Sequence, residues 1–327
     1  MRVAINGFGR IGRMVFKASL KNPRVNVVAV NDLGDINLMA HLLKYDSVQP
    51  FKFKKVRVKG NTIIADGHKI KVFSEKDPTK LPWKRLKIHT VCESTGFFRT
   101  RELASQHIVA GAKKVLISAP AKGDQPVKTI VMGVNHKDIT KKDVILSNAS
   151  CTTNCLAPMV KVLNDAFKIK KGFFTTAHAY TSTQNLIDGP HKDWRRARAA
   201  AVNMIPTTTG ASEAVGLVIP EMKGKLNGKA LRVPLAVGSL TDFTVTLSKK
   251  PTIRQVNNAF KKASKKMKVL EYSEDELVSS DIVGCSCSVI FDSKLTMVNG
   301  NMVTVFGWYD SEWGYSTRMI DLMSKMK

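Results

Sequence analysis

The sequence predicts a two-domain α/β protein, in which a domain built on a parallel sheet precedes a domain with a mixed, largely antiparallel sheet. The chain has 327 residues, which suits two domains of about 150 residues each. Strand-like and helix-like stretches alternate from the first residue, and repeated β-α-β units predict a parallel sheet. After Ser147 the strands become longer and alternate with period two, as antiparallel strands do.

The first domain is expected to alternate buried strands with helices. Short apolar runs predict strands at Arg2–Ile5, Val25–Val30, Val91–Ser94, Val115–Ser118, Thr129–Val131 and Val144–Leu146. Helical periodicity predicts helices at Ile11–Leu20, Leu38–Lys44 and Thr100–Ala110. Between Phe51 and Phe73, turn signals at Gly60-Asn61 and Asp66-Gly67 predict antiparallel hairpins inserted after the second helix.

The second domain follows a join near residue 148 that has no low-complexity linker. Its strands are predicted at Gly172–Thr176, Ala230–Val233, Thr241–Leu247, Ser286–Phe291 and Met302–Trp308. Its helices are predicted at roughly Cys155–Lys168, Ile253–Lys265 and Ser316–Met326, the last after a polar turn at Asp310–Tyr315.

Composition favours a globular protein of a reducing compartment. Hydrophobic residues make up 43% of the chain, and no run approaches the roughly 18 apolar residues of a membrane-spanning helix. Glycines interrupt the apolar start before a signal-peptide core can form, so we expect a cytoplasmic protein. The five cysteines are odd in number and sparse, which argues against a disulfide framework. Cys285 and Cys287 alternate on one face of a predicted strand, and no metal site is predicted.

The net charge of +26 is unusual for a soluble enzyme. It is compatible with nucleic-acid contact, with attraction of anionic substrates, or with adaptation of a whole proteome. The lysines are scattered and not interleaved with aromatic residues, so a solvated basic surface is the favoured interpretation. A secondary nucleic-acid-binding role remains as an alternative.

A glycine-rich turn follows the first predicted strand. The stretch from Asn6 reads NGFGRIG and fits the GxGxxG pattern. Gly7 allows the tight turn, Gly9 lets a pyrophosphate approach the backbone, and Gly12 lets the helix pack closely on the sheet. Asp32 lies 20 residues beyond Gly12, where a carboxylate binds ribose hydroxyls and repels a 2′-phosphate. We therefore predict NAD as the cofactor; the alternative is a glycine turn beside a surface aspartate.

Residues 147–155 read SNASCTTNC and place Cys151 among small polar side chains, just before a predicted helix. The positive end of a helix dipole lowers the pKa of a thiol and favours the nucleophilic thiolate. The alternative is a small buried hydrophobic side chain, as most free cysteines are.

A cysteine nucleophile needs a base, and His178 stands at the end of a predicted strand before a hydroxyl-rich loop. A thiolate–imidazolium pair would activate the sulfur near neutral pH. His41, His68, His107 and His136 are expected at ordinary surface positions. The loop from Tyr180 to Arg198, the run Thr207–Gly210 and the isolated Arg232 offer hydroxyls and arginines that suit bound phosphate. For Arg195 and Arg198, structural ion pairs are an equal alternative.

The chain carries the motifs NGFGRIGR, NDLGD, SNASCTTNC, HAYTSTQ, HKDWRRARAA, IPTTTGASEAVG, GKLNGKALRVP and WYDSEWGYS. Together they resemble one family, the phosphorylating glyceraldehyde-3-phosphate dehydrogenases. The resemblance runs from end to end. It implies a Rossmann-type NAD-binding domain at residues 1–149, a catalytic domain at 150–314, and a C-terminal helix at 315–327 that packs back on the first domain. It also implies a homotetramer.

The resemblance further implies roles for individual residues. It makes Cys151 the nucleophile and His178 the acid/base. It assigns the substrate's C3 phosphate to Thr181, Thr183 and Arg232, and inorganic phosphate to Ser150, Thr152, Thr209, Gly210 and Arg196. It assigns NAD to Gly7, Gly9, Arg10, Ile11, Gly12, Asp32, Lys76, Ser94, Thr95, Gly96, Ser118 and Ser311, the last in place of the family's usual asparagine.

The implied reaction oxidises D-glyceraldehyde 3-phosphate to 1,3-bisphosphoglycerate through a thioester on Cys151, with NAD and inorganic phosphate as partners and no membrane. Erythrose-4-phosphate dehydrogenase, which uses the same Cys/His pair and hydrolyses the acyl enzyme, is the alternative within the same class.

Overall fold

The computed structural model describes residues 1–326, and these divide into two compact units. Unit 1 comprises Met1–Met132, His136–Ser150 and the chain from Ser316, and unit 2 comprises Gly133–Asn135 and Cys151–Tyr315. Within residues 1–326, every helix is too short or too polar to cross a bilayer.

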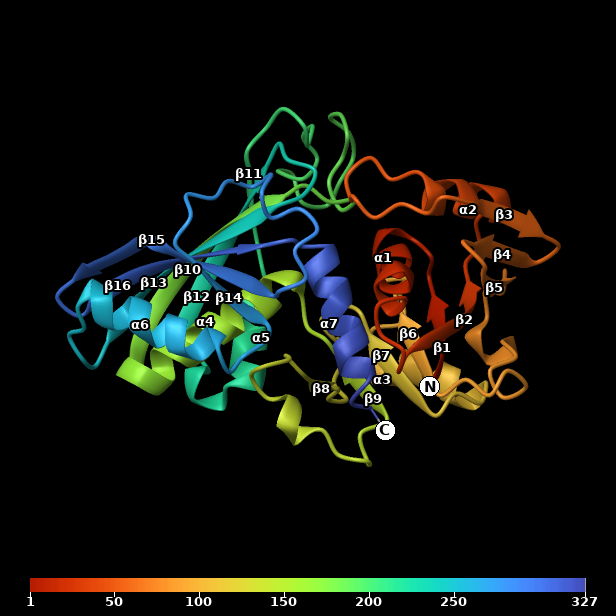
Figure 1. The fold of residues 1–327 in the computed structure, drawn as a ribbon, viewed down its shortest axis with the longest axis horizontal. Helices are drawn as coiled ribbons and strands as arrows, with labels where there is room; N and C mark the ends of the chain where they lie inside the picture. The colour runs from red at the N-terminus through yellow and green to blue at the C-terminus, as the bar shows by residue number, and fades with distance from the viewer. Residues whose placement is uncertain (327) are drawn as a thin grey trace. The chain divides into compact units, whose positions relative to one another are not determined.

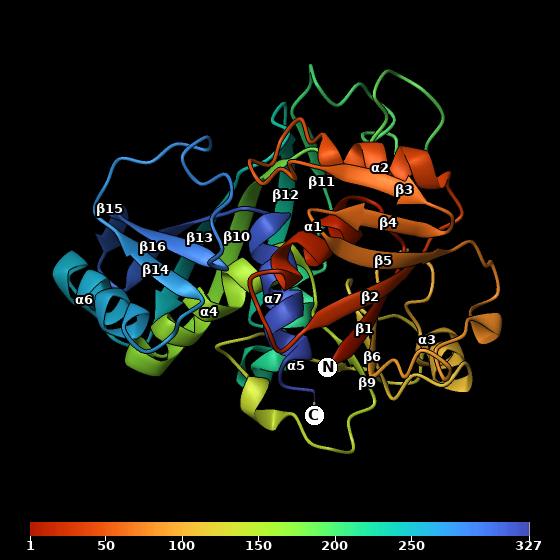
Figure 2. The ribbon, with the colours of Figure 1, turned by 45° about the vertical axis from the view of Figure 1, so that its right-hand side comes forward.

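Unit 1 is built on a sheet of nine strands in the order β3-β4-β5-β2-β1-β6-β7-β9-β8. The strands are β1 Arg2–Asn6, β2 Asn26–Asn31, β3 Val56–Lys59, β4 Thr62–Ala65, β5 His68–Phe73, β6 Thr90–Glu93, β7 Lys114–Ile117, β8 Lys128–Thr129 and β9 Ile145–Ser147. All neighbours from β5 to β8 in this order pair in parallel, whereas β3, β4 and β5 form antiparallel hairpins. Figure 2 shows the hairpin strands continuing the sheet beyond β2.

The hairpins confirm the predicted insertion between Phe51 and Phe73. The turn between β4 and β5 places Asp66 at φ 45° and Gly67 at φ 90°. Two successive left-handed residues are the geometry of a two-residue hairpin turn, and Asp-Gly is its preferred sequence. The Asp66-Gly67 turn signal therefore predicted this part of the sheet correctly.

Four α-helices of the described residues belong wholly or partly to unit 1. They are α1 Arg10–Ser19, α2 Ile36–Lys44, α3 Arg101–Val109 and α7 Trp313–Met323, of which α7 enters the unit at Ser316. Asp35 caps α2 by accepting from Leu38 N, and Thr100 caps α3 by accepting from Leu103 N. These caps explain why both helices begin where they do.

Unit 2 carries a sheet of seven strands in the order β11-β12-β10-β13-β16-β15-β14. The strands are β10 Ile169–Ala179, β11 Ile205–Thr207, β12 Leu226–Val233, β13 Ser239–Leu247, β14 Leu270–Ser273, β15 Val289–Asn299 and β16 Met302–Tyr309. Only the pairs β10–β12 and β14–β15 are parallel, and the other four are antiparallel. The predicted mixed, largely antiparallel sheet is confirmed.

Helices cover one face of this sheet. They are α4 Cys151–Phe167, α5 Ala211–Val218 and α6 Ile253–Ser264, and Figure 1 shows them together on the same side of the strands. Alternation along β10 turns Phe174, Thr176 and His178 toward the buried side, whereas Phe173 is 70% exposed. Neither figure shows a helix of the described residues over the opposite face.

The structure differs from the sequence prediction in several elements. Helix α4 begins at Cys151, four residues before the predicted start at Cys155. Strand β15 begins at Val289, so Cys285 and Cys287 precede the strand and do not alternate along it. Helix α7 begins at Trp313, inside the stretch predicted to be a turn. The elements β11, α5 and β14 were not predicted.

Candidate active site

The glycine turn after β1 is tightly built. Gly7 has φ 90°, and a Cβ there would lie 2.7 Å from the backbone of Ser94 and Thr95. A Cβ on Gly12 would lie 2.1 Å from the carbonyl oxygen of Gly7. Both positions therefore require glycine for a steric reason.

Gly9 is different, because a Cβ built on it would meet no atom within 4 Å. It caps α1 without any side-chain hydrogen bond. An open glycine at a helix N-terminus is what a pyrophosphate needs in order to reach the backbone N–H groups. The turn thus fits a dinucleotide.

Asp32 follows β2, and its carboxylate is held by two backbone amides. Phe8 N donates to Oδ2 at 2.6 Å, and Gly34 N donates to Oδ1 at 3.0 Å. The carboxylate is therefore fixed beside the glycine turn. Because β2, β1 and β6 are parallel neighbours, their carboxyl ends meet at one edge of the sheet.

In unit 2, Cys151 is the first residue of α4 and follows an elbow in the backbone. Ala149, two residues earlier, is fully buried and left-handed at φ 55°. Its N–H donates to Ser147 Oγ at 3.1 Å. A left-handed alanine costs free energy that the surrounding packing must offset, and such residues concentrate at functional sites.

Cys151 and His178 meet. The Sγ of Cys151 lies 3.3 Å from Nε2 of His178, which is 3% exposed at the end of β10. This contact joins a helix start to a strand end 27 residues further along the chain. The predicted nucleophile and base are thus within hydrogen-bonding reach for sulfur.

Burial controls the protonation of this pair. It raises the pKa of the Cys151 thiol, against the opposing effects of Arg232 and the Thr152 N–H. Burial, with help from the Arg232 charge, lowers the pKa of His178 to about 3. Both shifts favour the neutral forms and oppose the expected thiolate–imidazolium pair, which stays a prediction. Thiolate formation requires proton transfer from Sγ to Nε2.

Two partners compete for Nδ1 of His178. The carbonyl oxygen of Ala179 lies 2.6 Å from it, and Nη1 of Arg232 lies 2.8 Å from it. When Nδ1 carries the proton and donates to Ala179, Nε2 is free to accept the thiol proton. When Nδ1 accepts from Arg232, Nε2 carries the proton and donates toward the sulfur. In the first arrangement Nε2 can accept the thiol proton, and in the second it can give a proton back.

Comparison with known proteins accounts for both units. Residues 1–101 match the model of the glyceraldehyde 3-phosphate dehydrogenase NAD-binding domain, and residues 150–311 match the model of the C-terminal domain. Similar relatives include glyceraldehyde-3-phosphate dehydrogenase 1 of Bacillus subtilis strain 168, at 55% identity over 98% of this chain and 97% of the relative. The chain belongs to the glyceraldehyde-3-phosphate dehydrogenase family.

Two further family members give the same result. The glyceraldehyde-3-phosphate dehydrogenase of Geobacillus stearothermophilus is 54% identical, over 98% of this chain and 97% of its own. That of Clostridium pasteurianum is 50% identical, over 98% and 96%. Membership of this family makes the chain an NAD-binding oxidoreductase of the glycolytic type, as the sequence predicted.

Around the Cys/His pair of this family member, Tyr309 was missed by sequence reasoning. Its hydroxyl lies 2.7 Å from Thr176 Oγ1 and 3.1 Å from Thr152 Oγ1, and its ring packs edge-on against His178 at 5.9 Å. The motif WYDSEWGYS contained this residue, but no local pattern tied it to His178. Thr152, expected to bind phosphate, turns its hydroxyl to Tyr309 and is buried.

The other predicted anion-binding residues of unit 2 lie in two groups. Thr181 Oγ1 and Thr183 Oγ1 are 2.8 Å apart, after β10. Arg232 lies on β12 beside β10, in register with His178. Among the described residues, its Nε is buried and has no hydrogen-bond partner.

The second group surrounds the start of α5. Gly210 caps this helix without a side-chain hydrogen bond, and Thr209 precedes it. Nε of Arg196 donates to Thr207 Oγ1 at 2.9 Å and pairs with Asp193 at 3.4 Å. Arg198 pairs with Asp188 at 2.6 Å, which is the structural alternative considered for it. Ser150 is half-buried directly before Cys151, and Ser311 is buried two residues before α7.

The remaining cofactor residues of unit 1 lie at the carboxyl ends of its strands. Ser94, Thr95 and Gly96 follow β6, and Ser118 follows β7. Arg10 opens α1, and its guanidinium pairs with Asp46 at 2.9 Å, while Ile11 is half-buried behind it. Lys76 is exposed in the segment after β5.

A buried polar network joins the ends of β1, β2 and β6 to α3, and the sequence analysis did not predict it. Asn31 Nδ2 donates to Asn6 Oδ1 at 2.7 Å, and Asn6 Nδ2 donates to Glu93 Oε2 at 2.6 Å. His107 Nε2 lies 3.0 Å from the same carboxylate oxygen. Trp83 Nε1 donates to His107 Nδ1 at 3.2 Å, so the proton of a neutral His107 sits on Nε2. His107 is fully buried, and its expected surface position is wrong.

Proposed function

We propose that this chain oxidises D-glyceraldehyde 3-phosphate and transfers the acyl group to inorganic phosphate, giving 1,3-bisphosphoglycerate through a thioester on Cys151. The observation that carries the proposal is the 3.3 Å contact between Cys151 Sγ and His178 Nε2. The family supplies the substrate class. Cys151 and His178 carry out the steps of the reaction.

In the oxidative half, Cys151 gives its proton to Nε2 of His178, and its sulfur adds to the aldehyde carbon. Protonated His178 returns this proton to the new oxygen, which becomes a hydroxyl. Its Nε2 then takes the proton back as a hydride leaves the carbon and the carbonyl re-forms. Bound NAD supplies the hydride acceptor. The thioester keeps the acyl group activated, so inorganic phosphate can displace the Cys151 sulfur in the second half.

Two anion sites serve the two phosphates in this proposal. Thr181, Thr183 and Arg232 bind the C3 phosphate; the partnerless Nε of Arg232 supports this assignment. Ser150, Thr209, Gly210 and Arg196 bind inorganic phosphate, with Thr152 contributing through its backbone because its hydroxyl is bonded to Tyr309. The open N-terminus of α5 at Gly210 supports the second site.

For NAD, we assign the pyrophosphate to Gly7, Gly9, Arg10, Ile11 and Gly12, and the adenosine ribose to Asp32. The empty space around Gly9 supports the first assignment. The adenine and ribose wall is assigned to Lys76, Ser94, Thr95, Gly96 and Ser118, and the nicotinamide carboxamide to Ser311. In domain terms, residues 1–149 with 315–327 bind NAD, and residues 150–314 carry the chemistry.

Turnover with and without phosphate tests the proposal. Initial rates of NADH formation from glyceraldehyde 3-phosphate are measured with phosphate, with arsenate and with neither. We expect turnover to need one of the two anions, because only they release the acyl group rapidly. Rapid turnover without either would instead indicate hydrolysis, as in erythrose-4-phosphate dehydrogenase. Cys151→Ser is expected to abolish oxidation, and His178→Asn to slow it by about 10²–10⁴-fold.

We further propose a homotetramer that works in the cytoplasm. The segment between β10 and β11 exposes large apolar side chains: Leu186, Ile187, Trp194, Val202 and Met204 are each at least 70% exposed in the single chain. The sheet face opposite α4, α5 and α6 exposes Phe173 as well. Apolar surface of this extent supports burial against further copies of the chain.

A further inference from the structure

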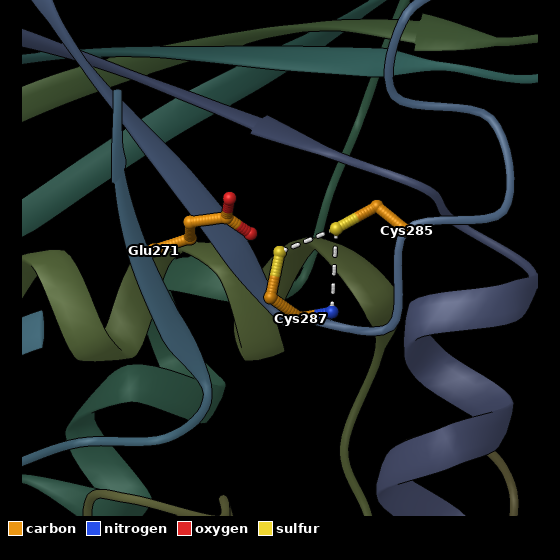
Figure 3. A group of neighbouring side chains, drawn as sticks. All are labelled: Glu271, Cys285 and Cys287. Carbon is orange, nitrogen blue, oxygen red and sulfur yellow. Dashed lines mark hydrogen bonds between the residues drawn. The ribbon is translucent and has the colours of Figure 1, made fainter. Parts of the chain in front are cut away.

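Three reactive side chains lie together in unit 2, apart from Cys151 and His178. They are Glu271 on β14 and Cys285 and Cys287 in the segment before β15, and Figure 3 shows the three groups turned toward one another. One ligand atom from each lies within 4.8 Å of the others. The two sulfur atoms are only 2.7 Å apart. No step of the proposed reaction uses these residues.

The separation of the sulfurs decides between two kinds of site. A zinc ion with sulfur ligands at about 2.3 Å holds two thiolates about 3.8 Å apart in a tetrahedron. A disulfide joins them at about 2.0 Å. From 2.7 Å, the sulfurs must separate by about 1.1 Å to hold zinc but approach by only about 0.7 Å to form a bond. The geometry favours the disulfide.

Hydrogen bonds before, within and after the pair hold this segment in place. Cys287 N donates to the Sγ of Cys285 at 3.4 Å, which folds the segment back on itself. Gly284 N donates to Asp310 at 2.8 Å, and Trp313 Nε1 donates to Ser286 Oγ at 3.3 Å. Little rearrangement is needed to bring the sulfurs together.

Cys285 and Cys287 differ in exposure, as a peroxide-reactive thiol and the second thiol that resolves it into a disulfide do. Cys285 is half-buried next to the exposed Ser286, whereas Cys287 is 9% exposed. The hydrogen bond from Cys287 lowers the pKa of the Cys285 thiol, against burial and the nearby Glu271 and Asp310 carboxylates. Redox-sensitive cysteines are accessible, acidic and adjacent to a second thiol.

We propose that Cys285 and Cys287 are a reversible oxidation site, which hydrogen peroxide converts to an intramolecular disulfide independently of Cys151. The Cys285 thiolate attacks one peroxide oxygen, the O–O bond breaks, and a sulfenic acid and water form once the leaving hydroxide is protonated. The Cys287 sulfur then attacks the Cys285 sulfur, the S–O bond breaks, and the departing hydroxide takes the Cys287 proton as a second water. Two thiols are oxidised, and one peroxide is reduced to two waters.

Peptide mapping of the full-length protein tests this. After treatment with hydrogen peroxide, free thiols are alkylated with N-ethylmaleimide in denaturant, and the chain is cut with trypsin. Residues 269–294 contain no lysine or arginine before Lys294, and Cys285 and Cys287 are their only cysteines. We expect this peptide to lose the mass of two hydrogens, to carry no maleimide, and to regain both thiols with dithiothreitol.

Matched variants identify the order of attack. Cys287→Ser should stop the reaction at a Cys285 sulfenic acid that dimedone traps, whereas Ser286→Ala should form the disulfide like the unaltered chain. The proposal is overturned if the unaltered peptide carries two maleimides after peroxide has oxidised Cys151, or if Cys285 proceeds to sulfinic acid. It is equally overturned if the purified protein contains one zinc per chain that Cys285→Ser removes.

Discussion

The proton positions on His178 govern what Cys151 can do. The Nδ1 atom has a carbonyl acceptor at 2.6 Å and a guanidinium donor at 2.8 Å. A shift of Arg232, such as binding of an anion to its guanidinium would produce, changes which of the two contacts is made. We infer that Arg232 positions the base, in addition to its proposed binding of the substrate phosphate.

The pH dependence of Cys151 alkylation follows from the direction of its pKa shift. Iodoacetamide reacts with the thiolate, and a raised thiol pKa means that the thiolate fraction is still growing with pH throughout the neutral range. We therefore expect the alkylation rate of the unaltered protein to rise steadily between about pH 6 and pH 9. His178→Asn should lower the rate at neutral pH because it removes the proton acceptor.

Mass spectrometry of the modified peptide follows this reaction at Cys151 alone. Cys92 is the internal control, because it is fully buried and burial raises its pKa to about 12. It should stay unmodified over the same pH range. A Cys151 rate that is already constant from pH 6 upward would contradict the expected neutral pair.

At this scale, the sequence pointed to the two side chains that the structure brings into contact, Cys151 and His178, but not to their environment. Small polar neighbours and a following helix pointed to Cys151, and a strand end pointed to His178. The burial that raises the pKa of Cys151 was not visible in the sequence, because it depends on packing from β16 and β12, which lie far along the chain. His107 was misplaced for the same reason: its partners Glu93 and Trp83 are 14 and 24 residues away.

Among the secondary-structure elements, the ends of β1, β2 and β6 are tied by the network of Asn6, Asn31, Glu93 and His107. The same edge carries the glycine turn and Asp32. Glu93 Oε1 also accepts from Thr95 N at 2.7 Å, which fixes the loop that Gly7 packs against. The network therefore holds in place the strand ends that carry the proposed NAD site.

Removing His107 should destabilise unit 1 measurably. His107→Ala leaves a cavity, removes one of the two hydrogen bonds to Glu93 Oε2, and leaves the indole N–H of Trp83 without its partner. We expect a loss of about 2–4 kcal/mol in the free energy of unfolding. Denaturant unfolding measures it, and NAD affinity should fall in parallel.

His68→Ala provides the control. His68 is exposed at the start of β5, and its loss should change the free energy of unfolding by no more than about 0.5 kcal/mol. If both variants unfold at the same denaturant concentration, the network contributes nothing to stability.

Element prediction succeeded where the chain carries its own signals. The hairpins of β3 to β5 have Gly60 and Asp66-Gly67, and α6 begins at a capping box of Thr252 and Gln255. It failed for short elements that depend on packing. Helix α5 has eight residues that are apolar on most sides, and β14 has four residues, two of which are Glu271 and Tyr272. Tertiary contacts, not local periodicity, define both.

Across the whole molecule, the uncovered sheet face and the exposed apolar segment before β11 support self-association. Phe173→Asp places a charge on this face and should shift the protein from the proposed tetramer to smaller species, as light scattering after size-exclusion chromatography would record. Leu217→Asp on α5 is the matched control, since Leu217 is 66% exposed and Phe173 is 70% exposed. If both variants remain tetrameric, this face does not form the interface.

The charge of +26 also belongs to the whole molecule. Like charges on every copy repel one another, so association must rest on apolar contact and salt should strengthen it. Nucleic-acid binding stays a prediction from the charge alone, and it should weaken steeply as salt rises.

At Ala149, whose backbone is left-handed, selection for stability and selection for catalytic rate should favour different residues. Holding a non-glycine residue at φ 55° costs about 1–3 kcal/mol, and glycine would relieve that strain. Populations selected for heat resistance should therefore acquire Ala149→Gly early. Populations selected for turnover should retain alanine, because a more flexible residue two positions before Cys151 would loosen the nucleophile. The methyl group of Ala149 is thus expected to lower thermal stability and to raise the catalytic rate.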